Sequence, residues 1–304
     1  MMVYIKFIVA KVYLLIWNYL LMFMFNFKSL LLILISLTLA GCGLKEKSIS
    51  QICEEAPGIC NDLHVIGDCR YNRTSLIRAR YNHLQESNDK NIKTLLEELD
   101  AYKVCLAPTL QIAYKRYKDR KQKRLDNYLA SQKVIDQLLK DSVGTQDPNL
   151  AYYLWTNFND LQAKKVFLAA AKQPNLTDPS VLAKLAVYYS ADETQKSLDF
   201  YYKALRESRS IEELPSNIFL QLVSFFFRTN KYEEAYIWAK VTLDTADDDD
   251  ELPPINLDLI VDRGFITEDM QSELDTKVDM YIEALEDGVF KEQAPQYFQE
   301  LPAQ

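Results

Sequence analysis

The chain is 304 residues long with a formal net charge of −8, and it contains only two histidines. Its charge is uneven, because residues 42–141 carry 18 basic and 14 acidic side chains whereas residues 142–304 carry 14 basic and 29 acidic ones. Nucleic-acid binding depends on cations that neutralise phosphates, so this balance argues against a nucleic-acid partner and favours a basic protein partner. The sequence predicts no catalytic dyad, cofactor or metal site, since histidine is scarce and no glycine-rich phosphate loop occurs.

Residues 1–41 are almost wholly apolar and are predicted to be a secretory signal. A basic residue, Lys28, precedes the apolar run 30–35, which is too short to span a bilayer and leads to Leu39-Ala40-Gly41-Cys42. This tetrapeptide resembles the lipobox of bacterial lipoproteins. The resemblance implies cleavage before Cys42, a diacylglycerol on its sulfur and acylation of the new amine, and three acyl chains hold a protein stably at a membrane. The alternative is a transmembrane helix with an incidental cysteine.

The segments on either side of this cysteine carry further expectations. Residues 1–21 are either a start-site overrun, with translation beginning at Met22 or Met24, or an extra membrane segment. Gly43, rather than aspartate, follows the cysteine. By analogy with lipoprotein sorting in Gram-negative cells, this predicts an outer-membrane lipoprotein whose body faces the periplasm. The polar residues 42–52 are predicted to be a lipidated tether.

Four cysteines follow the lipobox, and an even number in an oxidising compartment predicts two disulfides. These are Cys53, Cys60, Cys69 and Cys105. The sequence Ala56-Pro57-Gly58-Ile59 suits a type II turn, which would bring the first two cysteines together. Thr74–Glu86 and Asn91–Leu106 are predicted helices of a hairpin, and the last two cysteines meet at its open end. We therefore predict Cys53–Cys60 and Cys69–Cys105. The alternative, a zinc site, does not fit these spacings.

A long helix is predicted to complete a Cys-stapled helical domain over residues 53–141. Pro108 should end the hairpin, and Thr109 should cap a helix that runs to about Lys140. Its stretch KRYKDRKQKR, residues 115–124, holds seven basic residues and one acidic residue. It is either a patch that faces lipid headgroups or an acidic partner, or the solvated face of the helix. The second interpretation follows from an apolar helical spacing that would turn the charges outward, formed by Ile112, Tyr114, Tyr117, Leu125 and Tyr128.

Residues 148–290 are predicted to form helix pairs. Three small residues, Ala163, Ser197 and Ala235, begin similar second-helix patterns and are spaced by 34 and 38 residues. A period in the mid-thirties is typical of stacked helix pairs. We therefore predict an all-α fold in which the stapled hairpin and long helix precede an α-solenoid. The alternative is chance periodicity in a generic α-bundle.

Two stretches, LAKLAVYY (182–189) and NKYEEAYIWA (230–239), resemble tetratricopeptide or Sel1-like repeats. A fourth pair, Ile255–Val261 and Thr267–Glu286, is the predicted C-terminal cap, before a tail at 291–304. By the tetratricopeptide pattern, the first helix of each pair lines a concave, acidic groove. This nominates six partner-binding residues, namely Lys184, Val187, Gln221, Ser224, Phe227 and Arg228.

Taken together, the lipobox, the four further cysteines and the AYIWA sequence resemble an uncharacterised family of Gram-negative lipoproteins, a domain of unknown function. The resemblance covers most of residues 37–290 and implies no activity. From the residues, we expect a lipid-anchored periplasmic scaffold or adaptor that binds a protein or peptide without catalysis.

Two alternatives stay open. The first is a peptidoglycan-acting enzyme resembling lytic transglycosylases, which use a glutamic acid as their acid. The Glu-Ser pairs Glu86-Ser87 and Glu207-Ser208 lack the glycine-rich segment of such a domain. The second alternative is a purely structural envelope lipoprotein. The run DDDDE (247–251) lacks the glycine of an EF-hand loop, so it is predicted to be a solvated linker rather than a calcium site.

Overall fold

The computed structural model describes residues 46–63, 69–113, 115–116, 118–215, 217–246 and 253–290. Over these residues the secondary structure is helical and contains no strand, which confirms the predicted all-α class. None of the helices in this described part is long and apolar enough to cross a membrane. The predicted signal, the lipidated Cys42, the acidic run 247–251 and the tail 291–304 lie outside the described residues.

The chain divides into two units, one up to Asn61 and one from Asp62 onward. In the first, Ser48 and Gln51 form a capping box at the start of α2 (Ile49–Glu55), and Cys53 and Cys60 form the predicted disulfide. The predicted type II turn between them is wrong. Residues Pro57–Ile59 form the 3-10 helix η1, and Gly58 lacks the positive φ that a type II turn requires. Proline fits this short helix because its fixed φ is already helical.

The second unit begins with the predicted hairpin of α3 (Arg70–Gln85) and α4 (Asp89–Thr109), which pack against each other. The side chain of Asn88 accepts a hydrogen bond from the backbone amide of Asn91 and so caps α4. Cys69 and Cys105 form the predicted disulfide at the open end, with their Cα atoms 5.7 Å apart. The cysteine pairing inferred from the sequence is therefore confirmed.

The long helix α5 (Asp119–Asp141) begins later than predicted. Pro108 lies in the last turn of α4 and removes one intrahelical hydrogen bond, but the helix continues one residue past it, to Thr109, so Pro108 does not end the helix before it. Thr109 is the last residue of α4, and its hydroxyl donates to the carbonyl of Leu106 instead of capping a new helix. The N-cap position of α5 is Lys118, which makes no side-chain cap.

The face that α5 buries also differs from the prediction. Ile112 and Leu125 are exposed, and Tyr114 and Tyr117 lie outside the described residues. The buried positions are Arg124, Asn127, Ser131, Ile135 and Leu138. This partly polar face finds polar partners, because the amide of Asn127 donates to the carbonyl of Asp62 and accepts from the hydroxyl of Tyr102. Tertiary hydrogen bonding therefore replaces the apolar contact expected from the sequence.

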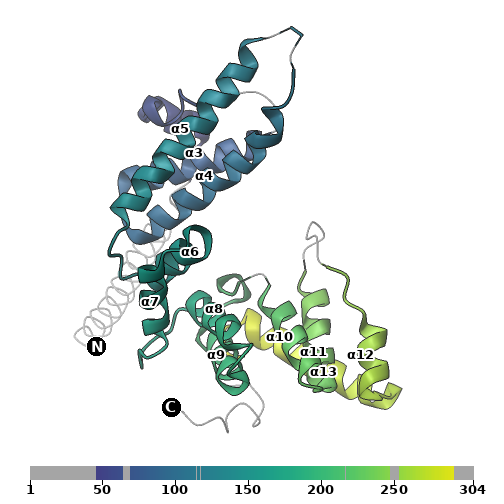
Figure 1. Cartoon of the computed structure of the whole chain (residues 1–304). Helices are drawn as coiled ribbons and strands as arrows, with labels where there is room; N and C mark the ends of the chain where they lie inside the picture. Colours follow the sequence, from purple (N-terminus) through teal and green to yellow (C-terminus); the bar gives the residue numbers. More distant parts are fainter. Residues whose placement is uncertain are drawn as a thin grey trace, which may run out of the picture. The chain divides into compact units, whose positions relative to one another are not determined.

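Three pairs of consecutive helices follow, and the two helices of each pair pack on each other (Figure 1). The pairs are α6 (Pro148–Phe158) with α7 (Leu161–Ala170), α8 (Pro179–Tyr189) with α9 (Thr194–Glu207), and α10 (Ile218–Arg228) with α11 (Tyr232–Asp244). The small residues Ala163, Ser197 and Ala235 are buried on the second helices, where they let the paired helices approach closely. The short 3-10 helix η2 (Ile211–Glu213) connects the last two pairs.

The C-terminal helices α12 (Leu257–Gly264) and α13 (Glu268–Glu286) both pack against α11. The indole of Trp238, on α11, is almost fully buried at the centre of this contact. It stacks on Phe219, with ring centroids 5.8 Å apart, and lies near Tyr281 and Phe290. These helices therefore cover the last pair, as a terminal cap would.

Candidate functional site

An open depression of about 340 Å³ lies along α8 and α10, the first helices of consecutive pairs. Four of the six nominated residues line it, namely Val187, Gln221, Ser224 and Arg228. The other lining residues are Ser190, Tyr201, Asn217 and Leu220. The structure therefore brings together, on one surface, residues that the helix-pair pattern assigned to one groove.

The floor of this depression is a tyrosine from α9. The hydroxyl of Tyr201 lies 3.4 Å from the amide oxygen of Gln221, to which it donates, and its ring meets Phe225 edge-on. Burial raises the pKa of Tyr201 to about 12, although the nearby Arg228 opposes the shift. The hydroxyl therefore stays protonated at neutral pH and remains a hydrogen-bond donor.

The lining residues are mostly neutral. Among those that the structure describes, Arg228 carries the one positive charge, and none is a carboxylate. Hydroxyl and amide groups suit the backbone of a bound peptide, and a guanidinium suits a carboxylate. The local chemistry thus differs from the acidic groove expected from the composition of residues 142–304.

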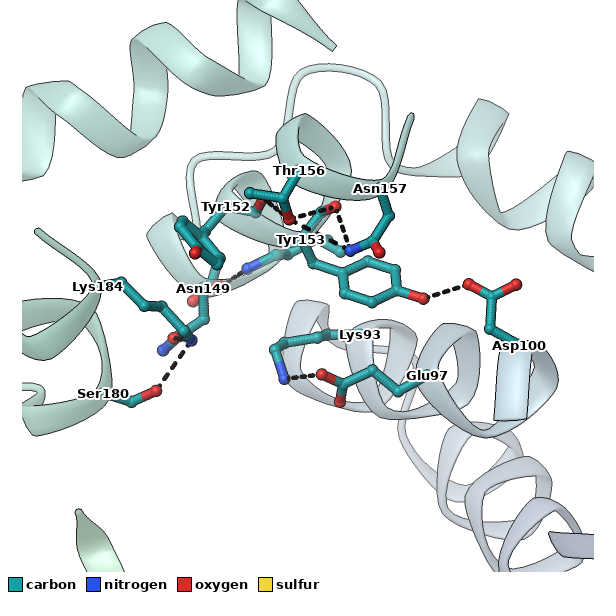
Figure 2. A network of polar contacts seen from close by, with 12 residues as sticks. Lys93, Glu97, Asp100, Asn149, Tyr152, Tyr153, Thr156, Asn157, Ser180 and Lys184 are labelled. Atoms are coloured by element: carbon teal, nitrogen blue, oxygen red, sulfur yellow. Dashed lines mark hydrogen bonds and ion pairs between the residues drawn. The ribbon is translucent and has the colours of Figure 1, made fainter. Parts of the chain in front are cut away.

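Two of the nominated residues lie elsewhere. Phe227 is half-buried and meets the ring of Tyr232 edge-on, whereas its neighbours Phe225 and Phe226 are buried in the core. Lys184 belongs to a polar network that involves α4, α6 and α8 (Figure 2). Its ammonium group donates to the side-chain oxygen of Asn149 at 2.7 Å and to the hydroxyl of Ser180 at 2.9 Å.

This network holds its charges in a partly buried setting. Burial, with a smaller contribution from the nearby Lys93, lowers the pKa of Lys184 to about 8, while Asp178 opposes the shift. The side chain of Asn149 accepts from Lys184 and donates to Asp178, so it relays between the cation and the anion. These hydrogen bonds join α6 to α8.

A second hydroxyl in the same region joins α6 to α4. Figure 2 shows the ring of Tyr153 directed toward Asp100, whose carboxylate accepts from the tyrosine hydroxyl at 2.6 Å. Burial and this hydrogen bond to an anion raise the pKa of Tyr153 well above its usual range. The bond therefore connects the stapled hairpin to the first helix pair across 53 positions of sequence.

Sequence reasoning missed several of these residues. Tyr201 is not among the nominated groove residues, because it lies on a second helix and the tetratricopeptide pattern assigns only first helices to the groove. Asn149 and Asp100 gave no signal, because their partners are distant in sequence.

The residues considered for catalysis are separate from the depression. Glu207 ends α9 and lines another open hollow with Arg209 and Glu213, whereas Glu86 follows α3 and is exposed. Among the described residues, no group of three histidine, cysteine or acidic side chains is placed to hold a metal ion.

Comparison with known proteins gives one match. Searches of curated proteins and of solved structures each returned none. A family profile described as "Protein of unknown function (DUF2989)" matches residues 39–240, about two thirds of the chain. The match begins within the predicted lipobox and includes the stapled hairpin and the three helix pairs through most of α11. The chain therefore belongs to the DUF2989 family.

Proposed function

We propose that this protein is a lipid-anchored scaffold of the bacterial cell envelope that binds a protein segment in the depression along α8 and α10. The observation that carries the proposal is the convergence of Val187 from α8 with Gln221, Ser224 and Arg228 from α10 on one open surface. Tetratricopeptide-like helix pairs, which we infer from the spacing and the paired packing, present their first helices for such contacts. A lining of amide, hydroxyl and aliphatic groups with one guanidinium and no carboxylate among the described residues supports binding as the proposed role.

The lining also suggests how a partner would be recognised. Arg228 would pair with a carboxylate of the bound segment, and the amide of Gln221 would hydrogen-bond to its backbone. The acidic body of residues 142–304 would attract a partner whose net charge is positive. A partner with an acidic anchor inside a basic surface satisfies both requirements.

Crosslinking in intact cells followed by mass spectrometry tests the groove. Ser224 is exposed and lines the depression, so Ser224→Trp should fill it without disturbing the core. Ser272→Trp, on the exposed face of α13, is the matched control. We expect one stoichiometric partner with the wild type and the control, a strong loss with Ser224→Trp, and a partial loss with Arg228→Ala. A partner retained equally by all variants, or no reproducible partner, would contradict the proposal.

The anchor is tested separately. Lipidation of Cys42 predicts that the protein incorporates labelled palmitate and fractionates with the outer membrane. Cys42→Ser should abolish the label and release the chain from its membrane fraction. Unchanged fractionation without label would contradict the anchor and leave the groove to be judged by crosslinking.

A further inference from the structure

A basic and aliphatic surface lies at the start of α5 and in the connection before it, far along the chain from the depression. It comprises the exposed cations Lys115, Arg116, Lys118, Lys121 and Lys123 and the exposed aliphatic residues Ile112, Leu125 and Leu129. Below, these eight residues are called the α5 basic surface. The sequence had suggested that such charges only solvate a helix whose apolar residues are buried.

Two of the apolar residues on which that interpretation rests, Ile112 and Leu125, are exposed, whereas Tyr128 is half-buried. Ile112, Leu125 and Leu129 are 43%, 37% and 55% exposed. The helix instead buries Asn127 and Ser131 on its opposite side. The aliphatic side chains are therefore presented to the surroundings together with the lysines.

Spacing places these two kinds of side chain on one face. Lys118, Lys121, Leu125 and Leu129 follow one another at intervals of three or four residues, which are neighbours on a helix surface. A helix face that combines lysines with exposed leucines has the chemistry of a membrane interface, where ammonium groups meet phosphates and aliphatic groups enter the acyl boundary.

One of the five cations, Lys123, is paired with an acidic residue, and the other four make no ion pair with the residues that the structure describes. Asp119 pairs with Lys123 at 2.8 Å, and this contact lowers the pKa of the carboxyl. Asp126 accepts from the amide of Gln122 at 2.7 Å. Of the seven basic residues in the stretch 115–124, Arg124 is buried, whereas the five that belong to the α5 basic surface are exposed.

We propose that the α5 basic surface binds the headgroups of anionic phospholipids. The argument is charge complementarity combined with the exposed leucines, which an acidic protein partner would not require. This contact is independent of the proposed groove, because it uses other helices and other side chains.

Site-specific photocrosslinking of the full chain in vesicles tests the contact. A photoreactive amino acid replaces Leu129, or Leu161 as the control, since Leu161 is similarly exposed (60%) but lies on α7. The vesicles contain neutral phosphatidylcholine alone or with one third phosphatidylglycerol. We expect lipid adducts from position 129 to be about tenfold more abundant with the anionic lipid, and to fall as salt rises from about 0.05 M to about 0.5 M. Position 161 should show no such preference.

Charge-reversal variants then distinguish lipid binding by the α5 basic surface from a nonspecific effect of the protein's net charge. Lys118→Glu with Lys121→Glu should abolish the anionic preference, because each basic residue near an anionic membrane contributes about a fivefold preference. Lys165→Glu with Lys172→Glu changes the net charge equally at exposed sites elsewhere and should leave the preference intact. Equal adduct yields in both kinds of vesicle, or equal loss with both double variants, would overturn the proposal. A protein adduct in place of lipid at position 129 in cells would also overturn it.

Discussion

Lys184 places an ammonium group among polar side chains in a partly buried setting, and its ionisation should be visible in the stability of the protein. Burial lowers its pKa to about 8 from 10.5 in an exposed lysine. Below about pH 8 the side chain is charged in the folded and the unfolded chain. Between about pH 8 and about 10.5 the folded chain releases the proton first, so the unfolded state binds more protons and stability rises with pH.

We therefore expect the free energy of unfolding of the wild type, relative to Lys184→Met, to increase by about 1–2 kcal/mol from about pH 7.5 to about pH 9.5. This increase in the free energy of unfolding is smaller than the full pKa shift implies, because solvent screens a partly exposed group. Urea denaturation at both pH values measures it. Lys165→Met, at an exposed site on α7, is the control and should show no such trend. Parallel pH dependence of wild type and Lys184→Met would refute the assignment.

Two fully buried serines should respond oppositely to the same substitution. The hydroxyl of Ser131 on α5 makes no hydrogen bond to any residue that the structure describes, whereas that of Ser197 on α9 donates to the carbonyl of Ala186 at 2.7 Å. Ser131→Ala removes an unsatisfied polar group and should leave stability unchanged or raise it by about 1 kcal/mol. Ser197→Ala leaves a buried carbonyl without its donor and should cost about 1–2 kcal/mol. Thermal and urea unfolding of the two variants compare the signs, and destabilisation of equal size would contradict this account.

The hairpin of α3 and α4 depends on a covalent bridge between distant residues. Cys69–Cys105 closes a sequence separation of 36, and Cys53–Cys60 closes one of 7. A longer loop loses more entropy when it is closed. The free energy of unfolding should therefore fall by about 3–4 kcal/mol in Cys69→Ser with Cys105→Ser, and by about 2–3 kcal/mol in Cys53→Ser with Cys60→Ser. Urea denaturation without reductant gives both values. A larger loss from Cys53→Ser with Cys60→Ser would show that loop entropy does not govern the difference.

The same elements show how far the sequence predicts the fold. Cysteine count and helical periodicity were sufficient for the hairpin, its disulfide and the three helix pairs, whereas Cys53–Cys60 was paired correctly from a turn of the wrong type. The start of α5 was not predictable. Pro108 and Thr109 are residues that usually mark a helix boundary, but both lie in the last turn of α4. Its buried face was also missed, since Asn127 and Ser131 follow no apolar pattern and their burial depends on neighbours from α4 and Asp62.

At the scale of the whole molecule, helix periodicity predicted half of the residues that line the depression and little of the polar network around Lys184. Val187, Gln221, Ser224 and Arg228 follow from the outward positions of the first helices. Lys184 has the same periodic position, yet its side chain turns to Asn149, 35 residues earlier. Pairings across such separations are fixed by how helices pack, which periodicity alone does not specify.

The bond between Tyr153 and Asp100 connects the stapled hairpin to the helix pairs, so its loss should affect cooperativity as well as stability. Tyr153→Phe leaves a part-buried carboxylate without its donor and should cost about 1.5–3 kcal/mol. The matched control is Tyr236→Phe, whose hydroxyl donates to Asp275 and connects α11 with α13. Hydrogen exchange should then show that α3 and α4 open separately from α8 to α11 in Tyr153→Phe. In Tyr236→Phe only α13 should lose protection, because the bond between α4 and α6 is intact. Uniform loss of protection in both variants would mean that residues 62–290 unfold as one unit regardless of this bond, and that apolar packing between α4 and α6 is sufficient to couple them.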